Sequence, residues 1–153
     1  MTTEQSRIER KTLIRAPRSR VWRAITDLGQ FSIWFGVKAE GAFEPGARLR
    51  MTSTHKGHEG ITFFMTVDEI SPEHRFSWRW NPGSEQPPPE TPTAPTTLVE
   101  FLLDEVEGGT MVTVIESGFD RVDPALRAKA FADNSEGWDF QMKSLSDYVG
   151  KTA

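Results

Sequence analysis

The feature that most constrains the fold is an alternation of apolar and polar residues that runs, with interruptions, from residue 37 to residue 119. Side chains two positions apart lie on the same face of a β-strand, so the alternation predicts strands with one apolar face. Glycine and proline interrupt the pattern repeatedly, as turns between strands require. We therefore expect an antiparallel meander whose six strands span Val37–Gly41, Arg48–Ser53, Gly60–Ile70, Arg75–Trp80, Thr97–Val106 and Thr110–Gly118.

The C-terminal segment Asp123–Val149 has helical periodicity instead. At about 100° per residue, one face carries a stripe of large apolar side chains, and Asn134 and Ser135 lie beside it. We expect a single long helix that packs this stripe on the sheet, while Lys143 and Asp147 form a weak pair on the solvated face. The stripe consists of Phe131, Trp138, Met142, Leu145 and Val149.

The N-terminal part predicts a strand at Ile8–Arg15, a helix that begins at Pro17, and a second short helix over Leu28–Trp34. Asp27 is the expected cap of the second helix, which stops before Gly36. The resulting order is β-α-α-β6-α. We predict an α+β helix-grip fold, in which a curved antiparallel sheet wraps around the long C-terminal helix.

Composition limits the classes of function. A chain of 153 residues with 37% apolar and 26% charged residues fits one globular domain that spans residues 1–153. The net charge of −4, with Lys and Arg scattered among acids, argues against nucleic acid as a partner. The polar start lacks a secretory signal and no stretch is long enough for a membrane span, so we expect a cytoplasmic protein. There is no cysteine, and the oligomeric state is not predicted.

Residues 81–96 contain six of the ten prolines and no residue suited to a core. A connection of this length within a domain is either a binding-site loop or a disordered insert. Hairpins in a meander alternate between two ends of the sheet, so this loop shares one rim with three other segments. They are 34–36, 55–59 and 118–123.

Glu116 is the most informative polar residue. Period two puts it on the inward face of the last strand, with Val112 and Val114. An unpaired buried carboxylate is very costly, so we expect Glu116 to bond to Asn134 or Ser135, to lie in water at the rim, or to bind a ligand.

The apolar sheet face and the helix stripe predict that a small hydrophobic molecule binds between them, without catalysis. Among the aromatics, we expect Trp34, Phe35 and Trp80 near the mouth of such a cavity. Phe63, Phe101 and Trp138 belong in the core. The candidate ligand-binding residues are Trp34, Phe35, Phe63, Met65, Trp78, Trp80, Phe101, Glu116, Phe131, Asn134, Ser135, Trp138 and Met142.

No cofactor, metal or catalytic residue is assigned. Segment 55–59, with two histidines and Glu59, is the only cluster of residues of metal-ligand type, and the spacing of its histidines across a glycine turn is typical of a solvated hairpin. The three histidines suggest no catalytic triad, and no glycine-rich phosphate loop is present. General acid-base catalysis by Glu116 stays open as an alternative.

Three motifs resemble a known family: residues 8–27 followed by Trp34-Phe35, residues 108–119, and Gly137-Trp138 in the last helix. They are similar to the START-related, or SRPBCC, superfamily, and within it to the C-terminal domain of the activator of heat-shock protein 90 ATPase. The resemblance implies a β-α-α-β6-α fold with a ligand cavity between sheet and helix. It also implies two alternatives to simple ligand binding, a stress-related co-chaperone with a chaperone partner and a polyketide cyclase or aromatase.

Overall fold

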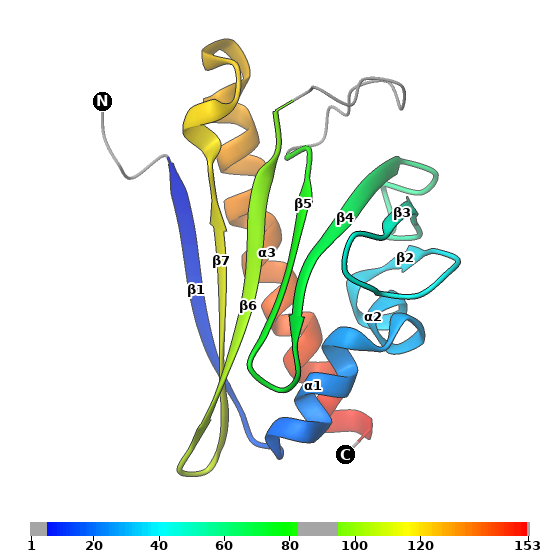
Figure 1. The fold of residues 1–153 in the computed structure, drawn as a ribbon, viewed down its shortest axis with the longest axis vertical. Helices are drawn as coiled ribbons and strands as arrows, with labels where there is room; N and C mark the ends of the chain where they lie inside the picture. The colour runs from blue at the N-terminus through cyan, green and yellow to red at the C-terminus, as the bar shows by residue number, and fades with distance from the viewer. Residues whose placement is uncertain (1–5, 83–94, 153) are drawn as a thin grey trace.

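The computed structural model describes residues 6–82 and 95–152. A curled, seven-stranded antiparallel sheet wraps around one long helix, as the helix-grip prediction requires (Figure 1). The strands lie in the order β1-β7-β6-β5-β4-β3-β2. The elements are β1 (Arg7–Ile14), α1 (Arg18–Thr26), α2 (Leu28–Phe35), β2 (Val37–Lys38), β3 (Arg48–Ser53), β4 (Thr62–Ser71), β5 (Arg75–Trp80), β6 (Thr97–Val106), β7 (Gly109–Ser117), the 3₁₀ turn η2 (Phe119–Arg121) and α3 (Pro124–Thr152).

The sequence prediction holds for every major element, and β3, β5 and β6 have the predicted bounds. The largest difference is β2, which has two residues where five were expected. After Lys38 the chain leaves the sheet, and it returns only where the Gly46 N–H donates to the Val67 carbonyl at 2.8 Å. The turn η2 was not predicted, and α3 continues three residues beyond Val149.

Local signals explain the two short helices. The Asp27 carboxylate accepts a hydrogen bond from the Gln30 N–H at 3.1 Å, which confirms the predicted cap of α2. Gly36 ends α2 with φ of 79°, a left-handed conformation that glycine adopts without strain. Both helices pack against the C-terminal half of α3, where the Ser144 hydroxyl donates to the Trp34 carbonyl at 2.6 Å.

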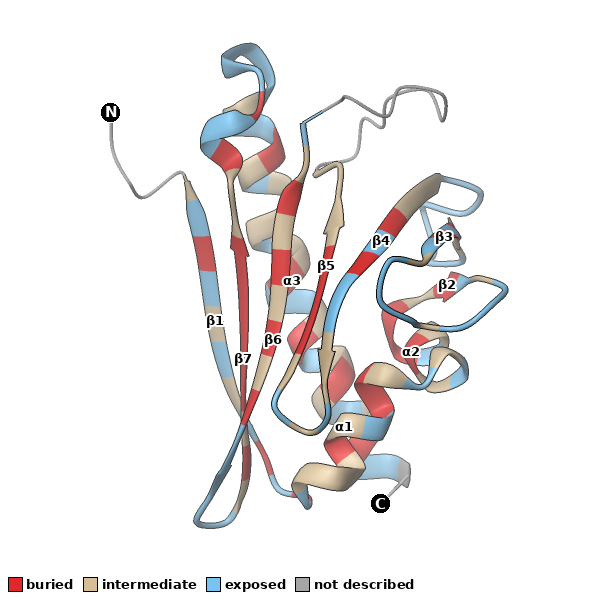
Figure 2. Ribbon diagram, in the orientation of Figure 1, coloured by how far each residue is buried: buried red, intermediate tan, exposed pale blue. Residues whose placement is uncertain are grey.

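The core lies between the inward face of the sheet and α3. Figure 2 shows buried residues along the central strands and exposed residues at the turns. On α3 the predicted stripe is buried at Trp138, Met142, Leu145 and Val149 but only partly at Phe131. The expected pair of Lys143 and Asp147 forms at 3.0 Å on the exposed side.

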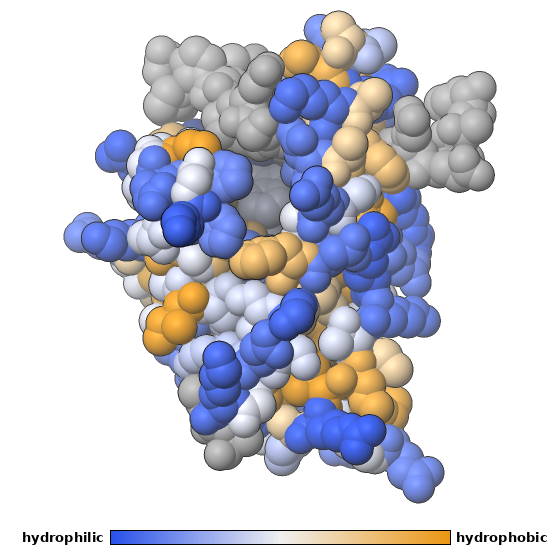
Figure 3. Space-filling view, turned by 180° about the vertical axis from the view of Figure 1, so that it is seen from behind, coloured by the Kyte–Doolittle hydropathy of each residue, from blue (hydrophilic) through white to orange (hydrophobic). Residues whose placement is uncertain are grey.

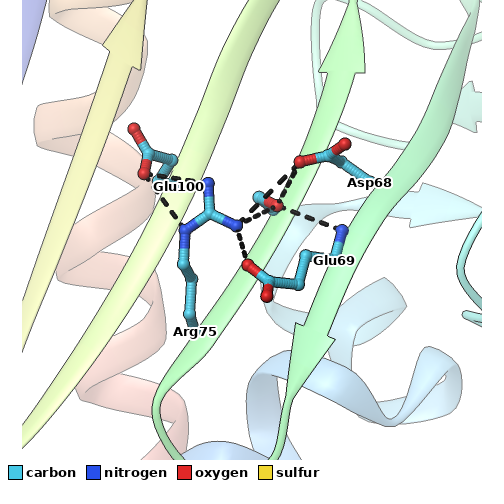
Figure 4. A network of polar contacts seen from close by, with 5 residues as sticks. Asp68, Glu69, Arg75 and Glu100 are labelled. Carbon is cyan, nitrogen blue, oxygen red and sulfur yellow. Dashed lines mark hydrogen bonds and ion pairs between the residues drawn. The ribbon is translucent and has the colours of Figure 1, made fainter.

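The outer face of the sheet is polar around Arg75, which points away from the core (Figure 4). Its guanidinium donates to Glu100 at 3.0 and 3.1 Å and also bonds to Glu69. Partial burial lowers the pKa of Arg75, but the hydrogen bonds to Glu100 and Glu69 outweigh it and raise the pKa above its ordinary value. Within the described part of the chain, no helix combines the length and hydropathy needed to cross a membrane.

Candidate ligand-binding site around Glu116

Glu116 lies near the end of β7 and is fully buried. The register of the sheet sets its surroundings. Glu116 is opposite Val99 on β6, which is opposite Trp78 on β5. The three residues therefore form one row across the inward face, and the carboxylate points toward α3.

Four neutral groups donate hydrogen bonds to this carboxylate. The Trp138 indole N–H donates to Oε1 at 2.8 Å. The Trp80 indole N–H and the Thr97 hydroxyl donate to Oε2 at 2.8 and 2.5 Å. The Asn134 amide nitrogen lies 2.9 and 3.0 Å from the two oxygens, so of the alternatives expected for Glu116 the bond to Asn134 is the one that forms.

Two structural elements bring these donors together. Trp80 is the last residue of β5 and Thr97 the first of β6, and they are directly opposite each other in the antiparallel pair. Asn134 and Trp138 are one helical turn apart and share a face of α3. The carboxylate is thus enclosed between the rim of the sheet and the helix, at the point where segment 81–96 leaves and rejoins the sheet.

The site has a carboxylate for which the described part of the chain supplies no cationic partner. None of the salt bridges among the described residues includes Glu116. The segment 83–94, which lies outside the described residues, contains no Lys, Arg or His in its sequence. Hydrogen bonds from neutral dipoles satisfy the oxygens but leave the charge unbalanced by an opposite charge.

Aromatic rings surround the polar cluster. Trp78 lies at the centre, with ring centroids 5.6 Å from Trp80 and Phe101 and 6.4 Å from Trp138. Phe35 is 6.1 and 6.2 Å from Trp80 and Trp138. The rings pack on one another and fill this part of the interior. The Trp78 indole N–H is buried and has no acceptor within the described residues.

The surface outside this cluster is hollowed. On the face that carries α3, Figure 3 shows a hollow between the β3–β4 turn and the helix, with hydrophobic atoms at its lower edge. The β3–β4 turn reaches α3 there, since the His55 and Phe140 rings are 4.7 Å apart. The Asn81 side chain donates to the Pro95 carbonyl at 3.0 Å and holds the two ends of segment 81–96 together.

The histidines of the β3–β4 turn stack on each other, with centroids 5.7 Å apart. In the same turn, backbone N–H groups of Glu59 and Gly57 bond to the Glu59 carboxylate and hold its pKa below the ordinary value. Across the described ranges, no three His, Asp or Glu side chains are grouped so that they could hold a metal ion.

Most predicted site residues converge on Glu116, but the mouth differs from the prediction. Trp80 is partly buried, as expected near an opening. Trp34 and Phe35 are buried instead, because α2 packs inward and the Trp34 indole donates to the Ala24 carbonyl at 2.7 Å. Phe63, expected in the core, is only partly buried and contacts Trp80 at 5.7 Å.

Four other predicted residues take no part in the hydrogen bonds to Glu116. Phe131 packs on Phe119, with centroids 5.3 Å apart. The Ser135 carbonyl accepts from Arg10 at 3.5 Å. Met142 is buried at the base of an open groove of about 360 Å³ between β1 and α3. Met65 is fully buried opposite Trp80.

That groove has polar walls, where Arg10 and Asp139 pair at 2.7 Å. It lies between the edge strand β1 and α3, and its lining includes none of the groups that bond to Glu116. Its lining consists of Arg10, Lys11, Thr12, Asp139, Met142, Lys143, Ser146 and Asp147.

Sequence reasoning missed Thr97, which is buried and makes the shortest hydrogen bond to Glu116. A signal was present in the sequence. Thr97 is the first strand residue after segment 81–96, and Trp80 the last one before it. In an antiparallel meander, two strand ends joined by one connection are neighbours. Alternation along each strand also turns both Trp80 and Thr97 toward the inward face.

Known structures and families provide the comparison. A solved structure of protein MLL2253 from Mesorhizobium loti is 21% identical, covers 96% of this chain and 98% of its own, and has a TM-score of 0.76. The Aha1 dimer from Colwellia psychrerythraea is 20% identical over 94% of this chain and 95% of its own, with a TM-score of 0.69.

DynU16, a protein of the dynemicin biosynthetic locus, is 22% identical with a TM-score of 0.69; the match covers 95% of this chain and 47% of DynU16. At these identities the likeness shows a shared fold. None of the curated proteins matches the chain significantly. The family model described as "Activator of Hsp90 ATPase homolog 1-like protein" matches residues 15–150, nearly the whole chain, so the protein belongs to this family.

Proposed function

We propose that the protein binds a small hydrophobic molecule between the sheet and α3, beside Glu116, without catalysing a reaction on it. The observation that carries the proposal is a fully buried carboxylate within an aromatic cluster, whose hydrogen-bond donors among the described residues are all neutral. Binding sites combine mostly apolar walls with a few oriented polar groups, and this cluster has that composition.

Two further features support the proposal. The buried Trp78 indole N–H has no acceptor among the described residues, and a ligand oxygen at that point would satisfy it. Trp80 is partly buried and can leave the cluster at lower cost than the fully buried rings. A ligand that enters there replaces the Trp80 ring as a neighbour of Trp78 and Trp138.

A thermal-shift screen with small aromatic and aliphatic compounds, followed by native mass spectrometry, tests the proposal. A ligand present at about 100 times its Kd stabilises the folded protein by about 2.7 kcal/mol. For a chain of this size, that corresponds to a rise in Tm of roughly 5–10 °C.

The variant Trp80→Phe, which keeps the ring but removes the N–H, should change the affinity for each hit. Trp22→Phe on α1 is the matched control and should leave the affinity unchanged. A screen without any stabilising compound, or hits that bind the Trp80 variant as they bind the parent protein, contradicts the proposal.

The family assignment favours a second candidate, a co-chaperone that stimulates the ATPase of heat-shock protein 90. Titration of the protein into that ATPase at micromolar concentration distinguishes the two candidates. Stimulation that survives Trp80→Phe would support the co-chaperone function, and no stimulation removes it. We also propose a cytoplasmic location, with which the absence of cysteine agrees.

A further inference from the structure

We propose that the ligand is a hydrophobic organic cation, such as a protonated primary amine on an aromatic or aliphatic body, with Glu116 as its counter-ion. This inference rests on the proposed function and names the class of molecule that the same site takes. It follows from the charge of the site and from the aromatic rings around it.

Glu116 lies among uncharged hydrogen-bond donors. The chain has 18 Lys and Arg residues, yet among the described residues every group that bonds to Glu116 is uncharged: two indoles, a hydroxyl and an amide. By comparison, the exposed side of the sheet gives Arg75 a carboxylate on each neighbouring strand. A buried charge is ordinarily paired, so the interior is built with a negative group whose positive complement the described residues do not supply.

The aromatic rings favour the same class of ligand. Two tryptophan side chains bond to the carboxylate, Trp80 and Trp138, and Phe35 and Trp78 pack on them with separations of 5.6–6.4 Å between ring centroids. The faces of aromatic rings attract cations, and tryptophan does so most strongly. A carboxylate beside several tryptophan rings is therefore complementary to an ammonium group, while the remaining rings contact the apolar body of the ligand.

The same geometry disfavours other ligands. An anion would meet a buried negative charge of the same sign. A neutral alcohol can donate one hydrogen bond to Glu116, and its oxygen can accept one from the Trp78 indole N–H, but it has no charge to balance the carboxylate. Because four donors already bond to the two carboxylate oxygens, one more neutral donor adds little there, whereas a cation is also attracted by the negative charge.

Two matched probes test the inference by isothermal titration calorimetry at pH 7. They are 1-naphthylmethylamine, which is protonated at this pH, and 1-naphthalenemethanol, its neutral analogue of nearly equal size. We expect the parent protein to bind the amine at least tenfold more tightly than the alcohol. This comparison needs no variant and does not depend on the stability of one.

The variant Glu116→Gln then assigns the preference to one residue. It should reduce the ratio of the two affinities to less than threefold. Glu136→Gln, which removes the same charge from an exposed position on α3, should keep the ratio of the parent protein.

The outcomes separate the inference from the proposed function. If the parent protein binds the alcohol as tightly as the amine, or more tightly, the inference that the ligand is a cation is wrong. The proposal of a site for hydrophobic molecules would still stand. An amine preference that survives in a folded Glu116→Gln variant overturns the role of Glu116. If neither probe binds the parent protein up to millimolar concentration, the proposed function fails and the inference fails with it.

Discussion

Replacing Glu116 by glutamine measures how much the buried carboxylate contributes to stability. The amide keeps one acceptor oxygen and puts an NH₂ group where the other oxygen was. In either orientation, this NH₂ group faces an indole N–H, that of Trp138 at the Oε1 position or that of Trp80 at the Oε2 position. Two donors then face each other in the buried site, and neither can bond to the other.

The expected cost follows from these contacts. A buried donor without a partner costs about 1–3 kcal/mol, and the substitution creates two of them, the indole N–H and the new amide. Removal of an unbalanced buried charge offsets part of this cost. We expect the free energy of unfolding to fall by about 2–4 kcal/mol, which lowers Tm by roughly 5–15 °C.

Urea unfolding followed by far-UV circular dichroism measures this change without relying on tryptophan fluorescence, which the substitution itself alters. The slope with urea should stay unchanged, because the surface exposed on unfolding is the same. Glu136→Gln is the control and should stay within about 0.5 kcal/mol of the parent protein. A Glu116→Gln variant as stable as the parent, or more stable, would refute the reasoning that the hydrogen bonds outweigh the buried charge.

Three further predictions concern single positions. Gly109→Ala should destabilise the fold by about 1–3 kcal/mol in urea unfolding, because its Cβ would clash with the Ile14 carbonyl of the neighbouring strand; an unchanged midpoint contradicts this. Asp27→Ala removes the cap of α2 and should lower the free energy of unfolding by about 1 kcal/mol in the same measurement. Asp27→Asn keeps an acceptor oxygen at the cap and should therefore be nearly as stable as the parent protein. Because the folded-state pKa of Glu59 lies below its ordinary value, the stability that this carboxylate contributes is present above the ordinary pKa and is lost as the pH falls through the folded-state pKa. An NMR titration should show its midpoint below that of a glutamate in a short peptide, and a higher midpoint would show that the bonds from Gly57 and Glu59 N–H do not form in solution.

The fold could be predicted from the sequence because periodicity and turn residues act locally. Strands β3, β5 and β6 are bounded by glycine, proline or charged turns, so their ends are marked in the sequence. The predicted length of β2 was too great, because the alternation of apolar and polar residues continues into a segment that leaves the sheet. Nothing local distinguishes a strand residue from an extended loop residue there.

The site could be predicted only in part. The bond between Glu116 and Asn134 follows from two periodicities, one that turns the glutamate inward and one that turns the asparagine toward it. The contributions of Thr97 and the Trp80 N–H depend on a register across the long segment 81–96, which the pattern alone does not give. The packing of the aromatic rings depends on side-chain volumes and rotamers, so a sequence cannot show whether the rings meet.

The most direct test of the account is a ¹H–¹⁵N spectrum of the indole N–H groups during titration with 1-naphthylmethylamine. The chain has five tryptophans, and each can be assigned by substitution with phenylalanine. If the site lies at Glu116, the resonances of Trp80 and Trp138 should move together and saturate with the Kd from calorimetry, while Trp22 on α1 stays in place. Saturable binding that leaves the Trp80 and Trp138 resonances unmoved would contradict a binding site around Glu116.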